Sequence, residues 1–284
     1  MSGKTVIVTG ANAGIGKVTA RELARMGARV IMVCRDEGRG AAAQEEVRAA
    51  AAEPDAVELL LVDMASQASI RAGAERFCAR HERLDVLVNN AGLILNERRT
   101  TVDGLEATFA TNHLGYFLFT HLLRDVLERG GPARVVNVAS EAHRFGSLDL
   151  DDVNFERRAF REMRVYGTTK LMNILFSREL ARRLREAGSA VTSNSLHPGT
   201  IVSGFGREAS WMIKSFYKLL GGLFLKTPEQ GARTQLFLAS APEVEGVSGA
   251  YFSNCKRARP SAAARDDDAA ARLWALSEKL CGLR

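Results

Sequence analysis

The sequence has 284 residues, of which 46% are hydrophobic and 25% are charged, as in a soluble globular protein that buries a large core. The 39 basic residues are scattered among 33 acidic ones, which argues against nucleic-acid binding, while the net charge of +6 favours a phosphorylated cofactor. No run of about 18 apolar residues occurs, so the sequence predicts no membrane-spanning helix.

Short runs of β-branched and aliphatic residues alternate with longer segments of helical periodicity. The predicted strands are Thr5–Thr9, Val30–Val33, Leu59–Val62, Val86–Val88, Val135–Val138, Val191–Leu196 and a last short strand at 249–252. The predicted helices are Ile15–Met26, Glu37–Ala51, Gln67–His81, Leu105–Glu128, Tyr166–Glu186, one that starts after Thr227 and one over Asp268–Leu280. Strands that are apolar on both faces and alternate with helices predict an α/β fold. We therefore expect a single doubly wound, Rossmann-type domain over residues 1–284, with a mainly parallel seven-stranded sheet that includes the order 3-2-1-4-5-6.

A glycine-rich turn joins the first predicted strand to the first predicted helix. It reads Thr9-Gly10-Ala11-Asn12-Ala13-Gly14-Ile15-Gly16, with the spacing G-x-x-x-G-x-G. Glycines here permit a tight turn and close backbone approach, and the amino terminus of the next helix can hold a pyrophosphate. Such a turn can also be purely structural, but its place after the first strand favours nucleotide binding. The candidate cofactor-binding residues of this glycine turn are Gly10, Asn12, Ala13, Gly14, Ile15 and Gly16.

The second predicted strand ends where a residue that reads the cofactor ribose belongs. The neutral thiol of Cys34 stands there and is followed by Arg35, a pair that suits a 2′-phosphate. This pair predicts NADP(H), and the alternative is a surface arginine at the start of a helix capped by Asp36. After the third strand, Asp63 with the adjacent Met64 is a candidate for binding the adenine, and Asp63 could equally cap the next helix.

Two amides and two small residues end the fourth predicted strand as Asn89-Asn90-Ala91-Gly92. The amides can tie neighbouring strands together, and the small residues let a cofactor lie across the sheet edge at Asn90, Ala91 and Gly92. Asn112 falls inside the long predicted helix, where asparagine is a poor helix former. It indicates either a polar kink that holds water or a side chain that faces solvent.

The strongest chemical signal is Val165-Tyr166-Gly167-Thr168-Thr169-Lys170, at the start of a predicted helix. Residues four positions apart lie on one helix face, so the Lys170 ammonium would favour the Tyr166 phenolate and lower the tyrosine pKa from about 10. The pair would exchange a proton in carbonyl or alcohol chemistry, although Tyr-x-x-x-Lys also occurs by chance on solvated helices. Ser140 ends the fifth strand, where catalytic groups gather, and is the candidate hydroxyl for positioning a carbonyl.

Three further segments flank this candidate site. Residues 141–164 carry a charge run that predicts a solvated flap, with His143 as a hydrogen-bonding residue. The aromatic residues expected to tuck against the rim are Phe145, Phe155 and Phe160. After the sixth strand, Pro198, Gly199 and Thr200 reverse the chain and would bring Thr200 towards the cofactor. The segment Trp211–Leu225 is rich in apolar residues, contains a glycine pair and is interrupted or flanked by lysines. Residues 205–226 therefore fit a substrate lid, a core helix or peripheral contact with an anionic membrane.

The order of five motifs along the chain resembles that of the short-chain dehydrogenase/reductase family, and the resemblance covers nearly the whole chain. The motifs are the glycine turn, Asn89-Asn90-Ala91-Gly92, Asn112, Ser140 and Tyr166 with Lys170. Finer features resemble its retinol dehydrogenase branch, namely Val33-Cys34-Arg35-Asp36, Asn112-His113-Leu114-Gly115, the long gap between Ser140 and Tyr166, and Tyr251-Phe252-Ser253-Asn254-Cys255-Lys256. The resemblance implies an NADP(H)-dependent oxidoreductase that interconverts an apolar alcohol and its aldehyde or ketone by hydride transfer at nicotinamide C4. The alternatives are a reductase of a steroid, quinone or porphyrin-type ring, and a non-catalytic NADP-binding sensor.

The resemblance also implies roles for four catalytic residues. Tyr166 would be the acid in reduction and the base in oxidation, and Lys170 would lower the Tyr166 pKa and bond the nicotinamide ribose. Ser140 would hold and polarise the substrate oxygen, while Asn112 would hold a water that resupplies the proton through Lys170. Family members usually associate through the helices that begin near Leu105 and Tyr166, which implies a homodimer or homotetramer.

The cysteines and the amino terminus bear on the cellular compartment. The sequence has four cysteines, which are Cys34, Cys78, Cys255 and Cys281. They show neither C-x-x-C spacing nor histidines at metal-ligand spacing. We interpret them as reduced thiols and expect neither a disulfide nor a metal site. The amino terminus enters an apolar run almost directly, without the pattern of a signal or transit peptide, so we expect a cytoplasmic protein.

Overall fold

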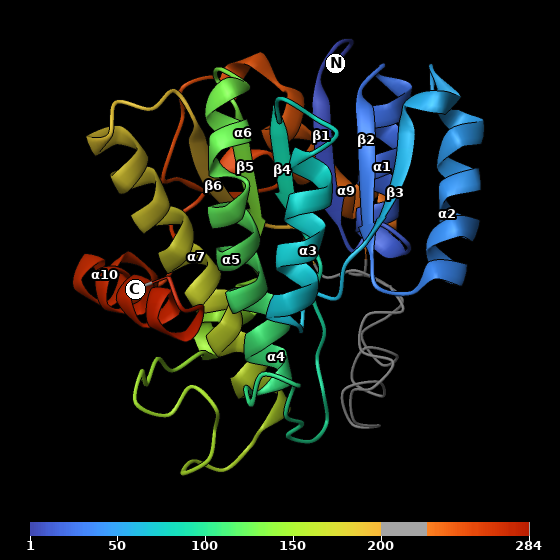
Figure 1. The fold of residues 1–284 in the computed structure, drawn as a ribbon. Helices are drawn as coiled ribbons and strands as arrows, with labels where there is room; N and C mark the ends of the chain where they lie inside the picture. The colour runs from blue at the N-terminus through green and yellow to red at the C-terminus, as the bar shows by residue number, and fades with distance from the viewer. Residues whose placement is uncertain (200–225, 284) are drawn as a thin grey trace.

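Eight strands form one sheet in the computed structural model, which describes residues 1–199 and 226–283 (Figure 1). Within these ranges the strands are β1 (Thr5–Thr9), β2 (Arg29–Cys34), β3 (Val57–Leu61), β4 (Val86–Asn89), β5 (Arg134–Val138), β6 (Thr192–His197), β7 (Tyr251–Ser253) and β8 (Lys256–Arg257). Their order is β3-β2-β1-β4-β5-β6-β7-β8, and every pairing from β3 to β7 is parallel. The predicted order 3-2-1-4-5-6 is therefore confirmed.

The centre of the sheet is buried on both faces, as its unbroken apolar runs predict. β1 lies between β2 and β4, and Ile7 is the register partner of both Ile31 and Leu87. All five residues of β1 are buried. Because these strands are parallel, their carboxyl ends form one edge of the sheet, which is the lower edge in Figure 1.

The eighth strand corrects the predicted count of seven. β8 pairs antiparallel with β7 through Lys256 and Ser253, and the two residues between the strands, Asn254 and Cys255, have φ of 51° and 59°. Two successive residues with positive φ match a type I′ turn, the usual two-residue connection of a β-hairpin. The sequence signal for this hairpin is weak because a cysteine stands where glycine usually follows asparagine.

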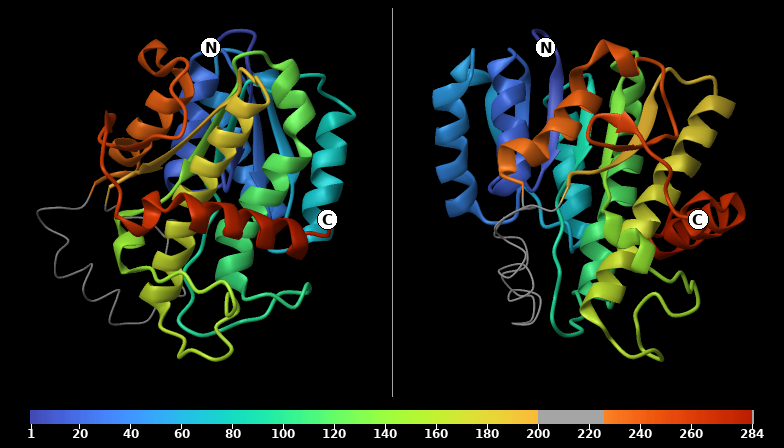
Figure 2. Two further views of the ribbon diagram at one scale, coloured as in Figure 1. Left: turned by 90° about the vertical axis from the view of Figure 1, so that its left-hand side faces the viewer. Right: turned by 180° about the vertical axis from the view of Figure 1, so that it is seen from behind.

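Helices cover both faces of the sheet. One layer contains α1 (Gly14–Arg25), α2 (Glu37–Ala50) and α9 (Pro228–Ser240), which pack on one apolar cluster (Figure 2, right). The other layer, in front in Figure 1, contains α3 (Gln67–Cys78), α5 (Gly115–Leu122), α6 (Arg124–Arg129) and α7 (Glu162–Glu186). α10 (Asp267–Leu280) lies across α7 on the outside of this second layer (Figure 2, left). This two-sided cover confirms the doubly wound α/β fold.

The helix predicted at Leu105–Glu128 is instead a series of shorter segments. They are α4 (Ala107–Phe109), the π-helical turn η2 (Ala110–Leu114), α5 and α6. The π turn contains Asn112, and the break between α5 and α6 falls at Leu123, with φ −93° and ψ 5°. A π turn inserts an extra residue into the helical repeat, and such turns often occur at functional sites. Short 3-10 turns complete the described chain at η1 (Pro54–Ala56), η3 (Glu141–Phe145), η4 (Pro242–Val244) and η5 (Ala263–Arg265).

The predicted flap at 141–164 has a buried anchor, which corrects the expectation of a fully solvated segment. Asp152 is only 4% exposed and accepts hydrogen bonds from the backbone N–H groups of residues 156–158. Phe155 is buried as predicted, whereas Phe145 is 70% exposed and does not tuck against the rim. α7 begins at Glu162, about one turn before the predicted start at Tyr166.

Some expectations concern residues outside the described ranges. Thr200 and all but the last residue of the predicted lid at 205–226 lie there. In the described part of the chain, no helix is both long and apolar enough to cross a membrane. All four cysteines are free thiols.

Candidate active site

The parallel strands bring the predicted site residues to one edge of the sheet. The glycine turn follows β1, Asn90 follows β4, Ser140 follows β5 and Arg35 follows β2. Since β2, β1, β4 and β5 are consecutive neighbours, these segments lie side by side in that order. An extended ligand that crosses the edge can therefore contact Arg35 at one end and the region of Ser140 at the other.

The glycine turn packs against the end of β4 too closely to admit side chains at Gly10 and Gly16. Gly10 has φ of 67°, a left-handed conformation that favours glycine, and a Cβ added to it would stand 2.9 Å from Ala91 Cα. A Cβ on Gly16 would overlap neighbouring side-chain and backbone atoms. α1 begins at Gly14 after Ala13, whose side chain cannot cap the helix, so its first N–H groups are available to an anion.

A hydrogen-bond network that the sequence pattern did not indicate ties the glycine turn to Asn90. Thr9 Oγ1 accepts from the N–H groups of Asn90 and Ala91 at 2.8 and 2.9 Å. Asn90 Nδ2 donates to Thr9 O at 2.7 Å, and Gln235 Nε2 donates to Asn90 Oδ1 at 3.1 Å. Thr19 of α1 donates in turn to Gln235 Oε1 at 2.8 Å. These bonds hold the ends of β1 and β4 against α1 and α9.

Asn89 confirms the predicted link between neighbouring strands. Its Nδ2 donates to Asn137 Oδ1 of β5 and to Thr120 Oγ1 of α5, both at 2.9 Å. Asn137 Nδ2 continues the chain to Ser193 Oγ of β6 at 3.1 Å. Both asparagines are fully buried, so these amides fix the relative positions of β4, β5 and β6 just beneath the edge.

Arg35 is exposed at the end of β2, where a phosphate could reach it. The cap of α2 is Asp36, whose Oδ1 accepts from Arg39 N at 2.8 Å. Cys34 is buried, and this burial raises the pKa of its thiol to about 11, so the thiol is neutral near pH 7. An exposed cation beside a neutral side chain would suit a 2′-phosphate. The same geometry fits the alternative of a surface arginine before a helix capped by Asp36, so contact of Arg35 with a phosphate stays a prediction.

Asp63 follows β3 but does not cap α3. The N-cap is Ser66, whose Oγ accepts from Ser69 N, while Asp63 Oδ1 accepts from Ala65 N at 2.9 Å. The N-cap alternative is therefore wrong, and contact between Asp63 and adenine stays a prediction. Met64 is only 5% exposed and its side chain belongs to the core, which leaves its backbone as the part that a cofactor could contact.

Asn112 is fully buried, so the alternative of a solvent-facing side chain is wrong. Its Oδ1 accepts from Leu93 N at 2.8 Å, and its Nδ2 donates to Leu93 O at 2.9 Å and to Thr169 Oγ1 at 3.1 Å. These bonds join the π turn to the segment after β4 and to α7. These hydrogen bonds occupy both the oxygen and the nitrogen of the Asn112 side chain. A water at the π turn would therefore bind to the backbone of the turn.

Lys170 is buried beside Tyr166 in the amino-terminal part of α7. The lysine is 2% exposed, and its Nζ lies 5.5 Å from the centroid of the Tyr166 ring and donates to Val138 O at 3.0 Å. Burial lowers the pKa of Lys170 to about 7. Tyr166 is half-buried, so its ring can meet both the Lys170 amine and a ligand at the sheet edge.

Close backbone packing brings Ser140 to the same place. Ser140 follows β5 and begins η3, where its Oγ accepts from Ala142 N at 3.2 Å. A Cβ on Gly167 would stand 2.5 Å from Ala142 O, so glycine at this position lets α7 approach η3 closely. The contact sets Tyr166, the residue before Gly167, against the segment that carries Ser140.

His143 makes hydrogen bonds with the backbone, as predicted. Its Nδ1 lies 2.7 Å from Ser140 O, and its Nε2 accepts from Ser261 N at 3.0 Å, which places the proton on Nδ1. Burial lowers the pKa of His143, and it lowers the pKa of His197 to about 4. Both imidazoles next to the Ser140 segment are therefore neutral at pH 7.

Tyr116 is a residue near the site that the sequence pattern did not indicate. It is fully buried on α5, and its ring centroid lies 5.7 Å from Lys170 Nζ. Its hydroxyl has no hydrogen-bond partner among residues 1–199 and 226–283. Burial raises the pKa of Tyr116 well above its usual value, so it stays a neutral phenol that offers Lys170 an aromatic face.

Pro198 and Gly199 follow β6 at the same edge. Pro198 is buried and Gly199 is half-buried. They lie beside the end of β5, and contact of this segment with a cofactor stays a prediction.

Comparisons with known proteins agree with this arrangement. The short chain dehydrogenase family model matches residues 4–212. Retinol dehydrogenase 14 of Homo sapiens is 44% identical over 297 aligned residues, which cover 100% of this chain and 88% of that protein. A solved structure of an uncharacterized protein from Mycobacterium paratuberculosis is 37% identical, with a TM-score of 0.78 over 99% of this chain and 94% of that one. The active-site complex of Pseudomonas aeruginosa RhlG with NADP is 25% identical, with a TM-score of 0.71 over 89% and 94% of the two chains.

Proposed function

The chain belongs to the short-chain dehydrogenase family, and we propose that it is an NADP(H)-dependent oxidoreductase that interconverts an apolar alcohol and its aldehyde or ketone. The observation that carries this proposal is the buried Lys170 beside Tyr166, at the sheet edge that also holds Ser140 and the glycine turn. Similarity to retinol dehydrogenases over the whole chain supports an apolar alcohol as the substrate class.

The residues at the sheet edge fit a dinucleotide. The tight turn at Gly10 and Gly16 supports this fit, because a Cβ on Gly10 would clash with Ala91 and a Cβ on Gly16 would clash with Asn90 and Gly10. The uncapped N–H groups of α1 would hold the pyrophosphate. The residues that would hold the cofactor are Gly10, Asn12, Ala13, Gly14, Ile15, Gly16, Arg35, Asp63, the Met64 backbone, Asn90, Ala91, Gly92, Tyr166, Lys170, Pro198, Gly199 and Thr200.

The cofactor preference for NADP(H) over NAD(H) would come from Arg35. An exposed guanidinium after a neutral buried thiol suits a 2′-phosphate, whereas an acidic residue in the place of Cys34 would repel it. The NADP complex of a structural relative supports the same choice.

We expect Arg35→Ala to weaken NADPH binding by about ten- to a hundredfold and NADH binding much less. Only NADPH loses a charge-assisted bond to its phosphate, worth roughly 1.5–3 kcal/mol. Fluorescence titration of both cofactors measures the two affinities. Arg29→Ala is the matched control, because Arg29 stands at the opposite end of the same strand and pairs with Glu58. An equal loss for NADPH and NADH in Arg35→Ala would show that Arg35 has a structural role.

The reacting carbonyl would lie between Ser140 and Tyr166. When bound, NADPH supplies a hydride from nicotinamide C4 to the carbonyl carbon. Ser140 Oγ would donate a hydrogen bond to the carbonyl oxygen and polarise it, while Tyr166 would give that oxygen its phenolic proton. In oxidation the Tyr166 phenolate would take the proton back from the alcohol. A protonated Lys170 would favour that phenolate and bond the nicotinamide ribose.

The π turn would complete the proton path. Asn112 holds this turn against Leu93 and Thr169, and Thr169 directly precedes Lys170 on α7. We infer that a water on the backbone of the turn resupplies a proton to Lys170 after each reduction. The widened geometry at Asn112 supports this role because a π turn disturbs the regular pairing of helical carbonyls.

The test of the proposed function is NADPH consumption with a panel of aldehydes and ketones that includes retinal. Turnover of long apolar carbonyls in preference to small polar ones is the expected result. Turnover of steroid, quinone or porphyrin-type rings alone would move the substrate to that class. Tight NADPH binding without turnover of any carbonyl would instead make the protein a non-catalytic sensor.

We also propose a cytoplasmic protein that forms a homodimer or homotetramer. The expected contact helices correspond to the series from α4 to α6 and to α7, and α10 already packs on α5 and α7. Trp274 of α10 lies 4.9 Å from the ring of Phe117 on α5 and 5.9 Å from that of Phe176 on α7. An oligomer would therefore use the parts of α5 and α7 that α10 leaves uncovered. Light scattering of the purified protein measures the oligomeric state.

A further inference from the structure

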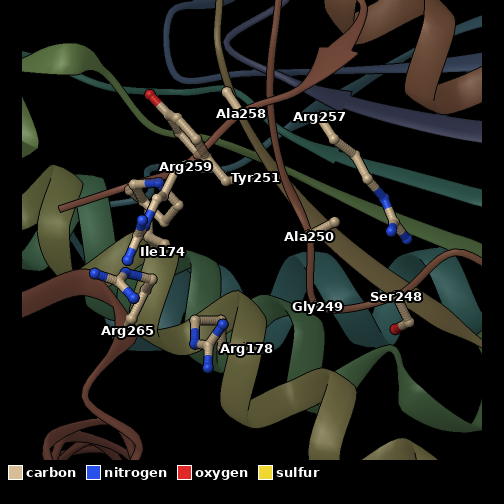
Figure 3. A pocket seen from close by; sticks show the side chains of 11 residues that line it. Ile174, Arg178, Ser248, Gly249, Ala250, Tyr251, Arg257, Ala258, Arg259 and Arg265 are labelled. Atoms are coloured by element: carbon tan, nitrogen blue, oxygen red, sulfur yellow. The ribbon is translucent and has the colours of Figure 1, made fainter. Parts of the chain in front are cut away.

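A second pocket lies apart from the candidate active site, between α7, β7 and the segment 257–265 (Figure 3). Its volume is about 430 Å³, within the range of small-molecule sites. It lies about one to two helical turns further along α7 than Lys170, since Ile174 and Arg178 line it. Neither the glycine turn nor any of the proposed catalytic residues belongs to its lining.

Arginine is the main charged side chain of this pocket. Four arginines line it, and they are Arg178, Arg257, Arg259 and Arg265. In Figure 3, Arg178, Arg259 and Arg265 lie on one side of the view and Arg257 on the other. We call this site the arginine pocket.

Most of this positive charge is not neutralised by the protein. Arg178 pairs with Asp267 at 2.7 Å, whereas the other three arginines form no ion pair within the described ranges 1–199 and 226–283. The neighbouring carboxylate of Asp266 caps α10 by accepting from Ala269 N at 2.9 Å. In addition, the buried Nε of Arg178 has no acceptor among the described residues. Three exposed guanidinium groups without an ion-pair partner in the described ranges, gathered along one pocket, favour the binding of an anion.

The segment that carries the unpaired arginines is held in place by its backbone. Ala258 N donates to Tyr251 O at 2.8 Å, which continues the β7–β8 pairing. Arg144 donates a side-chain hydrogen bond to Arg259 O at 3.1 Å, and Ser261 N donates to His143 Nε2 at 3.0 Å. The arginines are therefore presented by a fixed backbone, which lowers the entropy lost when a ligand binds.

We propose that the arginine pocket binds a phosphorylated ligand that carries at least two negative charges. Guanidinium groups match phosphate oxygens with paired N–H donors, and the three arginines without an ion pair carry more positive charge than a single carboxylate would neutralise. A free phosphorylated small molecule and the phosphorylated headgroup of a lipid share this chemistry. The site is separate from the proposed dinucleotide site, so binding does not depend on the proposed function.

The test uses inorganic pyrophosphate as the probe and the full chain with and without NADPH. Calorimetric titration should show pyrophosphate binding that weakens at least tenfold in Arg259→Gln/Arg265→Gln, because two charge-assisted contacts are lost. The control is Arg233→Gln/Arg272→Gln, which removes the same charge from exposed arginines on α9 and α10 that do not line the pocket. We expect the control to change the affinity by less than about threefold, since neither arginine lines the pocket and their more distant charges are screened by salt.

A second arm distinguishes the source of the phosphate. Each variant is sedimented with phosphatidylcholine vesicles that do or do not contain phosphatidic acid. Binding in solution identifies a free phosphorylated molecule, and binding only to the acidic vesicles identifies a lipid headgroup. Either result supports the proposal if it is lost in the pocket variant and kept in the control. No binding in both arms, equal losses in both double variants, or full displacement of pyrophosphate by NADPH would overturn it.

Discussion

Tyr166→Phe is expected to lower kcat by about 100-fold or more while NADPH affinity changes only a few-fold. The substitution keeps the ring that lies 5.5 Å from Lys170 Nζ, so the packing of α7 is preserved. It removes the only proposed proton donor to the carbonyl oxygen, and a positioned general acid is worth roughly 10²–10⁴ in rate. Steady-state turnover of the best carbonyl from the panel, together with a fluorescence titration of NADPH, separates the two effects.

Tyr116→Phe provides the matched control for this experiment. Tyr116 is the other tyrosine whose ring lies near Lys170, at 5.7 Å from Nζ, and its hydroxyl has no partner among the described residues. Removing that hydroxyl should leave most of the turnover intact. A Tyr166→Phe enzyme that stays active, or equal losses in both variants, would show that the proton comes from another group.

The central sheet could be predicted because its strands are apolar on both faces. A run such as Val6–Val8 cannot face water on either side, so it predicts a parallel sheet covered by two helical layers. The edge hairpin is different, since its turn at Asn254 and Cys255 has no glycine and β8 is only two exposed residues long. The central strands are therefore predictable from their buried apolar residues, whereas the edge hairpin depends on a backbone conformation that its sequence does not mark.

The predicted segments of the candidate site meet at one edge, but their supporting contacts could not be predicted. The glycine turn and Tyr166 with Lys170 are local patterns, so spacing along the chain was sufficient. Gln235, in contrast, lies 145 residues from its partner Asn90, and no local pattern marks it. Gly167 likewise appears ordinary until α7 is seen against Ala142 O. Contacts between residues that are far apart in the sequence could therefore be identified only in the folded structure.

The 141–164 segment shows how composition can mislead. Its acidic and basic residues predict a solvated surface, yet Asp152 is buried and organises the turn by accepting from backbone N–H groups. A carboxylate that replaces water with several N–H donors can be buried at low cost. The composition of a segment gives its number of charged residues, but it does not show whether neighbouring backbone N–H groups can donate hydrogen bonds to a buried carboxylate.

Lys170→Met should abolish most activity and, at neutral pH, make the cofactor-free protein more stable. Burial lowers the Lys170 pKa from 10.5 to about 7, which means that the fold disfavours the charged form. Between these values the unfolded chain binds a proton that the folded chain does not, so the stability of the wild type rises with pH. Methionine removes that penalty, and Val138 O keeps a donor because Asn173 Nδ2 also bonds it, at 3.2 Å.

Urea unfolding of both proteins at pH 7 and pH 9, without cofactor, measures this effect. One pKa unit corresponds to about 1.4 kcal/mol, so the free energy of unfolding of the wild type should rise by about 2 kcal/mol relative to Lys170→Met over this interval. Lys256→Met, which removes an exposed lysine of β8, should follow the wild type. If wild type and Lys170→Met change in parallel with pH, Lys170 is charged in the folded protein throughout. That result would contradict the lowered pKa of Lys170. The residue beside Tyr166 in the proton path would then be a permanently charged ammonium.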